Sequence, residues 1–359
     1  MDTPSSEARA VASSNPWAGK KLSVNPLWVQ KLESTYAGFR QNGDTANAAK
    51  VRTLQRTGMF VWISSVRNLP DVDRVINHAR TQQRTTGVRQ IVGLVVYDIP
   101  GRDWNGVFSS GEFPPTEEGY LAYKRTFMKP IAEKLKAAHD LTFTVIVEPD
   151  AIGNLVTNID KPFRQKVAHW YERGVAHAIV ALQFPNVHIY VDIANGGWLG
   201  WPANLQPTAD ILAKIMARAK KGNNNKPTPI RGFSTNVSNF NPFNARVREP
   251  YTKGNDSWDE SHYINTISIY LKKAGLPLHF IVDQGRVMFP GARKTWGEFA
   301  NVRPAAFGAK PGTVVNNPYV DCVVWVKPAG ESDGPPNGGP PAGQWYPEYI
   351  RMMVRNSKL

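Results

Sequence analysis

Residues 142–158 read TFTVIVEPDAIGNLVTN, and the rest of the chain is organised around this stretch. Its first part, Phe143 to Val147, is a short apolar run rich in β-branched residues, which is typical of a buried parallel strand. The run ends at Glu148-Pro149-Asp150, before a segment that can form a helix. In barrels and open α/β sheets the active site lies at the carboxyl ends of the strands. Asp150 is therefore the first candidate for a catalytic group.

Six further strand-like runs alternate with amphipathic segments along the chain. The runs span residues 59–64, 91–97, 188–192, 230–234, 278–283 and 322–326. The amphipathic segments lie near residues 28–55, 71–85, 117–139, 162–182, 207–220 and 259–274. This alternation predicts an α/β fold, a distorted (β/α) barrel of about seven parallel strands with its site at their C-terminal ends. No break in composition divides residues 15–359, so we expect one domain after a polar tail of residues 1–14.

Composition excludes several classes of function. The 359 residues are 42% apolar and 20% charged, as in globular proteins, and no apolar run reaches the roughly 18 residues of a membrane span. Cys322 is the lone cysteine and the seven histidines lack ligand spacing, so we expect no disulfide, metal site or cofactor. The net charge of +14 is spread over helix-like segments without a nucleic-acid motif, which argues against a nucleic-acid partner. Residues 1–14 lack the charged-then-apolar order of a signal peptide.

Polar and aromatic side chains follow every predicted strand, where a common site would lie. They are Trp62 and Ser64; Tyr97, Asp98, Arg102 and Asp103; Glu148 and Asp150; Asp192 and Asn195; Thr235, Asn236 and Asn239; Asp283, Gln284 and Arg286; Lys327, Glu331 and Asp333. Helix capping explains some of the Asp, Asn and Ser residues. It does not explain Trp, Arg, Lys and Glu at the same edge, so a shared site is the better interpretation.

The residue types in this set suit the cleavage of a glycosidic bond. That reaction needs a carboxylic acid on one side of the bond and a carboxylate or its water relay on the other. Sugars also stack their apolar C–H faces on aromatic rings. The segment Gly197-Trp198-Leu199-Gly200-Trp201 offers two indoles between glycines that would let a flat ligand approach.

From Asn15 onward the chain resembles the catalytic domain of glycoside hydrolase family 6, a family of inverting cellulases. The matching segments are VVYDIPGRD with SSGE (95–103 and 109–112), VIVEPDAIGNLVTN (145–158), YVD with GWLGWPAN (190–192 and 197–204), TNVSNFN (235–241), DQGR (283–286) and WVKPAGESDG (325–334). The order and spacing of these segments make the resemblance specific. It implies that residues 15–359 form a glycoside hydrolase catalytic domain.

The resemblance also implies the roles of five catalytic residues. Asp150 would be the general acid. Asp103 would be the neighbouring aspartate that helps to hold the catalytic water and keeps the pKa of the acid high, because like charges held close favour one protonated partner. Asp333 matches the distal aspartate proposed as base, acting through a chain of water molecules. Ser109 would help to position the catalytic water, and Tyr97 would crowd the sugar ring into a distorted shape.

Further residues would bind the sugar chain by resemblance to the family. Trp62, Trp198 and Trp201 would be stacking platforms, and the polar residues of the site would be Asn239, Lys327, Glu331, Asp192, Arg286 and Arg102. Two positions depart from the family: Asn195 replaces a histidine, and Phe299 replaces a stacking tryptophan.

Structural alternatives stay open at several of these positions. Asp150 could cap the following helix, and Asp333 could be an ordinary turn residue. Asp192 and Arg286 could form an inner ion pair. Trp62 could be a core residue, and we prefer the core for Trp325.

Only about ten residues separate Gly334 from Trp345, where tunnel-forming cellobiohydrolases of the family carry a long loop. We therefore expect an open cleft and endoglucanase character. The alternatives are a cellobiohydrolase with a widened tunnel, since residues 102–113 keep the length seen in tunnel-forming relatives, and a catalytically weak carbohydrate-binding protein. The expected partner is cellulose or another β-1,4-glucan, bound by a secreted monomer.

Overall fold

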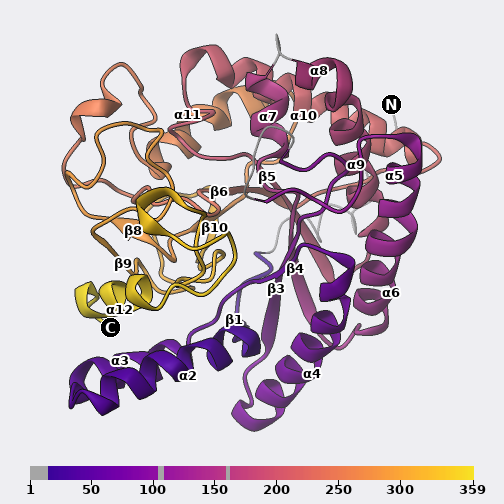
Figure 1. Cartoon of the computed structure of the whole chain (residues 1–359). Helices are drawn as coiled ribbons and strands as arrows, with labels where there is room; N and C mark the ends of the chain where they lie inside the picture. The colour runs from indigo at the N-terminus through magenta and orange to yellow at the C-terminus, as the bar shows by residue number, and fades with distance from the viewer. Residues whose placement is uncertain (1–14, 104–108, 159–161) are drawn as a thin grey trace.

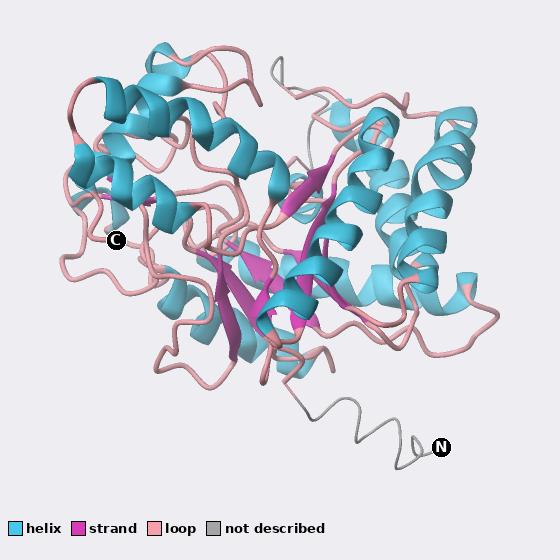
Figure 2. Ribbon diagram, turned by 90° about the horizontal axis from the view of Figure 1, so that it is seen from below, coloured by secondary structure: helices cyan, strands magenta, loops and turns pink. Residues whose placement is uncertain are grey.

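A computed structural model describes residues 15–103, 109–158 and 162–359, so the predicted tail of residues 1–14 lies outside the described residues. Parallel strands form the centre and helices surround them (Figures 1 and 2). The strands are β1 (Lys21–Leu22), β2 (Val61–Ile63), β3 (Gln90–Val96), β4 (Thr142–Val147), β5 (Val187–Asp192), β6 (Gly232–Thr235), β7 (Phe280–Asp283) and β10 (Val320–Val324). A separate antiparallel pair is formed by β8 (Val287–Met288) and β9 (Ala305–Ala306).

The large sheet runs in the order β1-β3-β4-β5-β6-β7-β10, and β2 also pairs with β3. All of its pairings are parallel. Across the remaining gap between β2 and β10, the Phe60 amide donates to the Trp325 carbonyl at 2.9 Å. Strands β2 to β7 with β10 therefore make a nearly closed barrel, which confirms the predicted distorted barrel of about seven parallel strands. The two-residue strand β1 is too short to show a periodic pattern and is not among the predicted strands.

The helices between residues 26 and 273 follow the predicted order, with some divisions that the amphipathic pattern does not reveal, and α12 near the C-terminus is not among the predicted segments. They are α2 (Pro26–Gln41), α3 (Thr45–Leu54), α4 (Leu69–Thr86), α5 (Glu117–Ala122), α6 (Lys129–Ala137), α7 (Ala151–Thr157), α8 (Pro162–Lys166), α9 (Ala168–Ala181), α10 (Pro202–Gly222), α11 (Glu260–Lys273) and α12 (Pro347–Asn356).

Three predicted helices are wrong as single α-helices. The segment near 28–55 breaks after α2, because Gly43 has a φ of 71° and Asp44 caps α3 through the amide of Asn47. The segment near 117–139 contains a π-helical stretch, Tyr123–Met128, between α5 and α6. The segment near 162–182 is divided into α8 and α9.

Strand residues alternate between the barrel interior and the layer under the helices. Ile91 and Val95 lie in the interior cluster, whereas Val92 and Leu94 pack in the cluster under the helices, as the two-residue period of a strand requires. At Gly93 a β-carbon would lie 2.6 Å from the ring of Phe60. This glycine therefore leaves room for a phenylalanine that fills the interior.

Near the N-terminal ends of the strands, the interior holds a buried polar cluster centred on Asp321. Arg231 donates two hydrogen bonds to this carboxylate, at 2.8 and 2.7 Å, and the Tyr190 hydroxyl donates one at 2.6 Å. Cys322 and Trp325 are buried among apolar residues, as their position in a strand run predicts. The cluster ties β10 to β5 and to the residue that precedes β6.

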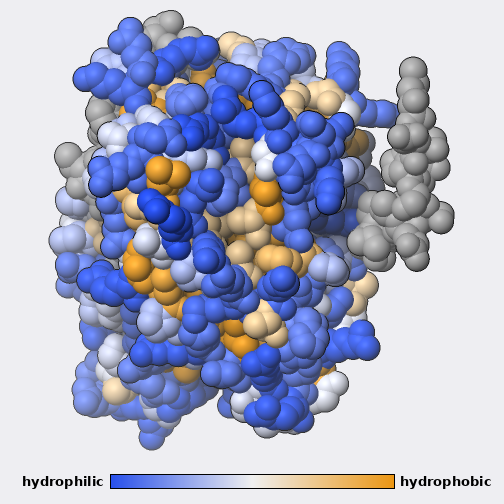
Figure 3. Space-filling view, turned by 90° about the vertical axis from the view of Figure 1, so that its right-hand side faces the viewer, coloured by the Kyte–Doolittle hydropathy of each residue, from blue (hydrophilic) through white to orange (hydrophobic). Residues whose placement is uncertain are grey.

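Hydrophilic residues cover most of the face shown in Figure 3, with apolar residues showing between them near its middle. Within the described residues, no helix is long and apolar enough to cross a membrane.

Candidate active site

The end of β4 places Asp150 in an unusual backbone conformation. Glu148 and Asp150 have φ values of 47° and 68°, in the left-handed region that non-glycine residues rarely adopt. Such residues cluster at functional sites. Asp150 occupies the N-cap position of α7, as the capping alternative predicts, but its carboxylate makes no capping hydrogen bond and is left available for other contacts. Instead the Tyr97 hydroxyl donates to Asp150 Oδ2 at 3.4 Å.

The surroundings of Asp150 favour its protonated form. Burial raises the pKa of Asp150, and the negative charge of Asp103 raises it further. The hydrogen bond from Tyr97 and the positive charge of Lys327 act in the opposite direction, and the resulting pKa is about 6. A carboxyl group with this pKa holds its proton in mildly acidic solution and can donate it to a leaving group.

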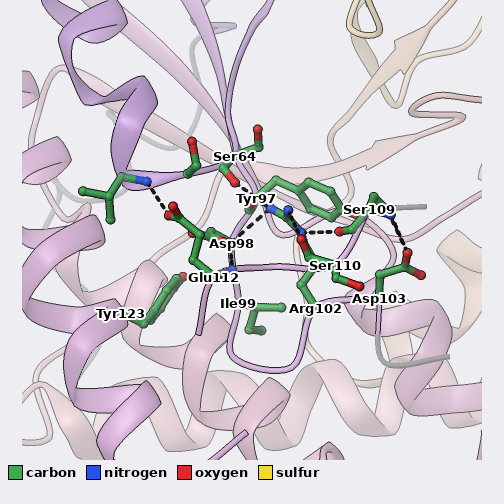
Figure 4. A network of polar contacts seen from close by, with 12 residues as sticks. Ser64, Tyr97, Asp98, Ile99, Arg102, Asp103, Ser109, Ser110, Glu112 and Tyr123 are labelled. Carbon is green, nitrogen blue, oxygen red and sulfur yellow. Dashed lines mark hydrogen bonds and ion pairs between the residues drawn. The ribbon is translucent and has the colours of Figure 1, made fainter. Parts of the chain in front are cut away.

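Asp103 lies beside Asp150 and holds Ser109. Its Oδ2 accepts from the Ser109 amide at 2.8 Å and from the Ser109 hydroxyl at 3.0 Å (Figure 4). Asp103 also has a positive φ, 54°. The two predicted water-positioning residues are therefore brought together, and the segment 104–108 between them lies outside the described residues.

Arg102 holds the two ends of this loop together (Figure 4). Its guanidinium donates to the carbonyl groups of Ser64, Ser109 and Ser110 at 2.8, 2.8 and 3.0 Å, and to that of Tyr97. The Arg102 side chain is only 9% exposed. These contacts give Arg102 a positioning role within the loop, and its predicted contact with substrate stays a prediction.

A buried carboxylate, Glu148, fastens the end of β3 to the end of β4. Glu148 Oε2 accepts from the amides of Asp98 and Ile99, both at 3.0 Å, and Oε1 accepts from the Tyr123 hydroxyl at 2.7 Å. Burial raises the pKa of Glu148 to about 7 and that of Asp98 to about 8. Its position directly after a core strand places Glu148 among the polar residues expected at the shared site, but the sequence predicts no role for it.

Asp192, at the end of β5, supports the backbone of Asp150. Its Oδ2 accepts from the amides of Asp150 and Ala194, both at 3.1 Å, and its Oδ1 accepts from the Ser234 hydroxyl at 3.2 Å. Burial, followed by the charge of Asp150, raises the pKa of Asp192 to about 8. Asp192 therefore orients the backbone of Asp150.

The alternative of an ion pair between Asp192 and Arg286 is wrong, because Arg286 pairs with Asp333. Arg286 Nη1 lies 2.9 and 2.7 Å from the two oxygens of Asp333. Asn301, which is not among the predicted residues, exchanges two hydrogen bonds with Asp333, at 2.9 and 3.0 Å. Asp333 is thus anchored to a buried guanidinium and is not an ordinary turn residue.

The family profile of glycosyl hydrolases family 6 matches residues 17–357. The chain belongs to glycoside hydrolase family 6. The 1,4-beta-D-glucan cellobiohydrolase CEL6B of Podospora anserina is 49% identical over 346 residues, which cover 96% of this chain and 82% of the relative. Endoglucanase-6B of Humicola insolens is 46% identical over 348 residues, covering 96% and 98%.

Solved structures of family 6 agree with the barrel. The endoglucanase CEL6B from Humicola insolens has a TM-score of 0.91 at 44% identity, and the comparison covers 96% of this chain and 98% of that chain. CcCel6C from Coprinopsis cinerea also has a TM-score of 0.91, at 38% identity and the same coverage. The relatives carry both cellobiohydrolase and endoglucanase names, so family 6 membership leaves the mode of attack open.

In this family 6 enzyme Trp62 lies at the gap between β2 and β10. Its Nε1 donates to the Val326 carbonyl at 2.9 Å, and its ring meets that of Tyr97 edge to face at 5.3 Å between centroids. Lys327 Nζ lies 5.8 Å from the centre of the indole. Trp62 is partly exposed and packs against the interior cluster, so it lies at the boundary of the core.

The loop after β5 presents the other two predicted tryptophan platforms. Trp198 Nε1 donates to Thr157 Oγ1 at 3.1 Å, and Trp201 Nε1 donates to the Gly197 carbonyl at 2.9 Å. Asn195 Oδ1 accepts from the Gly197 amide at 3.0 Å. Both indoles are partly exposed and held by hydrogen bonds at their edges, which leaves ring surface for stacking.

Asn239 belongs to a buried polar chain that joins three loops of the site. Arg293 donates to the side-chain oxygens of Asn239, at 3.4 Å, and of Asn241. Asn241 then donates to Glu260 at 2.8 Å, and Glu260 accepts from the Gly196 amide at 3.1 Å. Arg293, Asn241 and Glu260 are not among the predicted site residues. Asn241 ends the quoted segment TNVSNFN, which was a usable signal, whereas no local pattern marks Arg293 or Glu260.

Three further predicted residues differ in their surroundings. The Phe299 side chain is 58% exposed, which suits a stacking surface. Glu331 forms an ion pair with Lys31 of α2 at 2.6 Å, a partner far away in sequence. The Lys327 amide donates to Asp283 Oδ2 at 3.2 Å, so Asp283 holds the turn that carries Lys327.

Proposed function

We propose that residues 15–359 form a cellulase catalytic domain that hydrolyses β-1,4-glucosidic bonds in cellulose and related β-glucans with inversion at the anomeric carbon. The observation that carries this proposal is the raised pKa of Asp150 beside the Asp103–Ser109 pair. Solved family 6 relatives in complex with cellotetraose or a cellotrioside support the substrate class. The complete set of aspartates favours an enzyme over a carbohydrate-binding protein.

In the proposed reaction Asp150 gives its proton to the leaving glycosidic oxygen, and the bond from that oxygen to the anomeric carbon breaks. A water molecule held by Ser109 and Asp103 attacks the same carbon from the opposite face. The proton released by this water passes through further water molecules to the Asp333 carboxylate. Tyr97, packed edge to face against Trp62, crowds the sugar ring where the bond breaks.

We further propose that the substrate lies in an open cleft and is cut internally. The support is the segment 334–345, which folds back on itself. The Ser332 carbonyl accepts from the Gly343 amide at 2.9 Å, and Asn301 donates to the Gly334 carbonyl at 2.7 Å. Because these hydrogen bonds hold residues 334–345 in a short folded loop, the loop cannot extend across the cleft and cover a bound glucan chain. The alternative, release of cellobiose from chain ends, is favoured by the relatives named as cellobiohydrolases.

The test follows the viscosity of carboxymethylcellulose and the release of reducing ends together. For internal cutting we expect a steep fall in viscosity while few bonds are cut. Asp150→Asn should remove both signals, and exposed Asp256→Asn should leave them unchanged. Release of cellobiose from amorphous cellulose with little loss of viscosity would overturn internal cutting. Absence of both activities in the unaltered enzyme would overturn the proposed hydrolysis.

We also propose that the enzyme acts outside the cell, because polymeric cellulose cannot enter a cell. We propose as a separate point that it is a monomer. A monomer mass of 39.9 kDa is expected by light scattering of this chain. A dimer under the same conditions would contradict this part of the proposal.

A further inference from the structure

A pocket lies at the end of the barrel away from Asp150. It has a volume of about 620 Å³, within the range of small-ligand sites. Gln90 and Thr142, the first residues of β3 and β4, line it together with Asn186, which precedes β5. Strand β4 has six residues, so at about 3.3 Å per residue the pocket lies roughly 20 Å from the catalytic end.

Positive charge converges on this pocket. Lys20, Arg89, Lys136 and His139 line it, and Asp140 is the one acidic residue among the lining side chains. The Asp140 carboxylate is already bound by two hydrogen bonds from Arg80, at 2.8 and 2.7 Å.

Three cations of the pocket, Lys20, Arg89 and Lys136, form no ion pair within the described residues. In the ranges 15–103, 109–158 and 162–359, the side chains of Arg89 and Lys136 form no hydrogen bond or ion pair, and Lys20 donates only to the Pro16 carbonyl at 2.9 Å. Burial and the nearby charge of Arg89 lower the pKa of Lys20. Like charges gathered in a hollow without a partner repel one another, and a bound anion would relieve that repulsion.

The pocket is also lined by apolar side chains. Phe184 is partly buried against the core and Pro185 is exposed beside it, so the pocket offers an apolar surface next to its cations. A matching ligand needs carboxylates for Arg89 and Lys136 and an apolar ring face for Phe184. Sugar acids combine the two, because each pyranose ring carries a carboxylate and presents C–H groups on its faces.

We propose that this pocket binds an acidic oligosaccharide, a segment of a uronic-acid polymer, at the barrel end away from the neutral glucan cleft. The site would hold the enzyme on acidic polysaccharide while the cleft acts on neutral chains. It does not rest on the proposed hydrolysis, because binding is measured without turnover.

The experiment measures binding of trigalacturonate to the whole chain by isothermal titration calorimetry at low and moderate salt. We expect binding that weakens as salt rises, because exposed charges are screened. The double variant Arg89→Ala with Lys136→Ala should weaken it at least fivefold. The matched control, Lys220→Ala with Lys221→Ala at the exposed end of α10, removes the same charge elsewhere and should leave binding unchanged.

Two further ligands test whether binding requires both the sugar ring and its carboxylate. Cellotriose, neutral and of the same length, should not compete with trigalacturonate, and inorganic phosphate should compete only weakly. Equal weakening in the two double variants would overturn the proposal, because net charge alone would then explain binding. Phosphate competing as well as trigalacturonate would also overturn it. Hydrolysis of neutral cello-oligosaccharides should be the same in both double variants and the unaltered enzyme.

Discussion

Asp150 shows how one carboxyl group acquires its chemistry from its neighbours. Burial is the larger cause of its raised pKa and the charge of Asp103 is the second. With a pKa of about 6, Asp150 is mostly protonated below that pH. Asp103 also accepts a hydrogen bond from Ser109, so it has an electrostatic role toward Asp150 and a positioning role toward Ser109. These two roles can be told apart by pH dependence.

Hydrolysis should fall as the pH rises through about 6, because Asp150 must be protonated to donate. Asp103→Asn removes the negative charge that raises this pKa, so the alkaline limb of kcat/KM should move to lower pH. Ser109→Ala keeps the charge and should lower the rate without moving the limb. The profiles of the three enzymes on a soluble cello-oligosaccharide test this. An unmoved limb in Asp103→Asn would mean that burial alone sets the pKa of Asp150.

At the scale of secondary-structure elements, the site depends on how the ends of β3 and β4 are joined. Glu148 accepts hydrogen bonds from two backbone amides in the turn after β3 and from the hydroxyl of Tyr123 in the π-helical stretch. This one carboxylate therefore positions Tyr97 relative to Asp150 without touching the substrate. Arg102 does the same for the loop that carries Asp103.

Glu148→Gln should lower the free energy of unfolding by about 1–3 kcal/mol, because an amide group cannot accept all three hydrogen bonds. It should also lower kcat more than it raises KM, since the acid and the tyrosine lose their relative position. Thermal unfolding and steady-state kinetics measure the two effects. Tyr123→Phe, which removes one of the three bonds, should be milder, and exposed Glu118→Gln should be neutral. Unchanged kcat in a destabilised Glu148→Gln would show a purely structural role.

At the scale of the whole molecule, the barrel is fastened at both ends. The polar cluster around Asp321 links β10 to β5 and to Arg231 near the N-terminal ends, and hydrogen bonds from Phe60 and Trp62 cross the gap between β2 and β10. Burial alone would raise the pKa of Asp321, but hydrogen bonds from Arg231, His279 and Tyr190 lower it to about 2.

Asp321→Asn should destabilise the protein by roughly 3 kcal/mol at neutral pH, because it breaks a buried ion pair. The folded pKa lies below the unfolded value of about 3.9, so this stabilisation is present above pH 4 and is lost as the pH falls toward 2. Unfolding by denaturant between pH 2 and 7 measures the difference, which should shrink at low pH. Asp140→Asn, in the exposed pair with Arg80, should cost less than about 1 kcal/mol. A pH-independent difference for Asp321→Asn would contradict the assigned pKa.

The strand and helix order was predictable because apolar periodicity is a local property of the chain. The ends of the predicted segments were less predictable, since Gly43 and the π-helical stretch interrupt helices without changing the apolar pattern. The candidate acids were predictable too, because parallel strands bring their carboxyl ends to one edge of the barrel.

The sequence by itself determined the barrel, the family and the positions of the acids. Only the tertiary structure decided which side chains form ion pairs and hydrogen bonds with one another. Arg286 pairs with Asp333 and not with Asp192, Arg102 holds a loop, and residues 334–345 fold back on themselves. The physical reason is that ion pairs, hydrogen bonds and burial depend on distances between segments far apart in the chain, which periodicity and motif spacing do not encode.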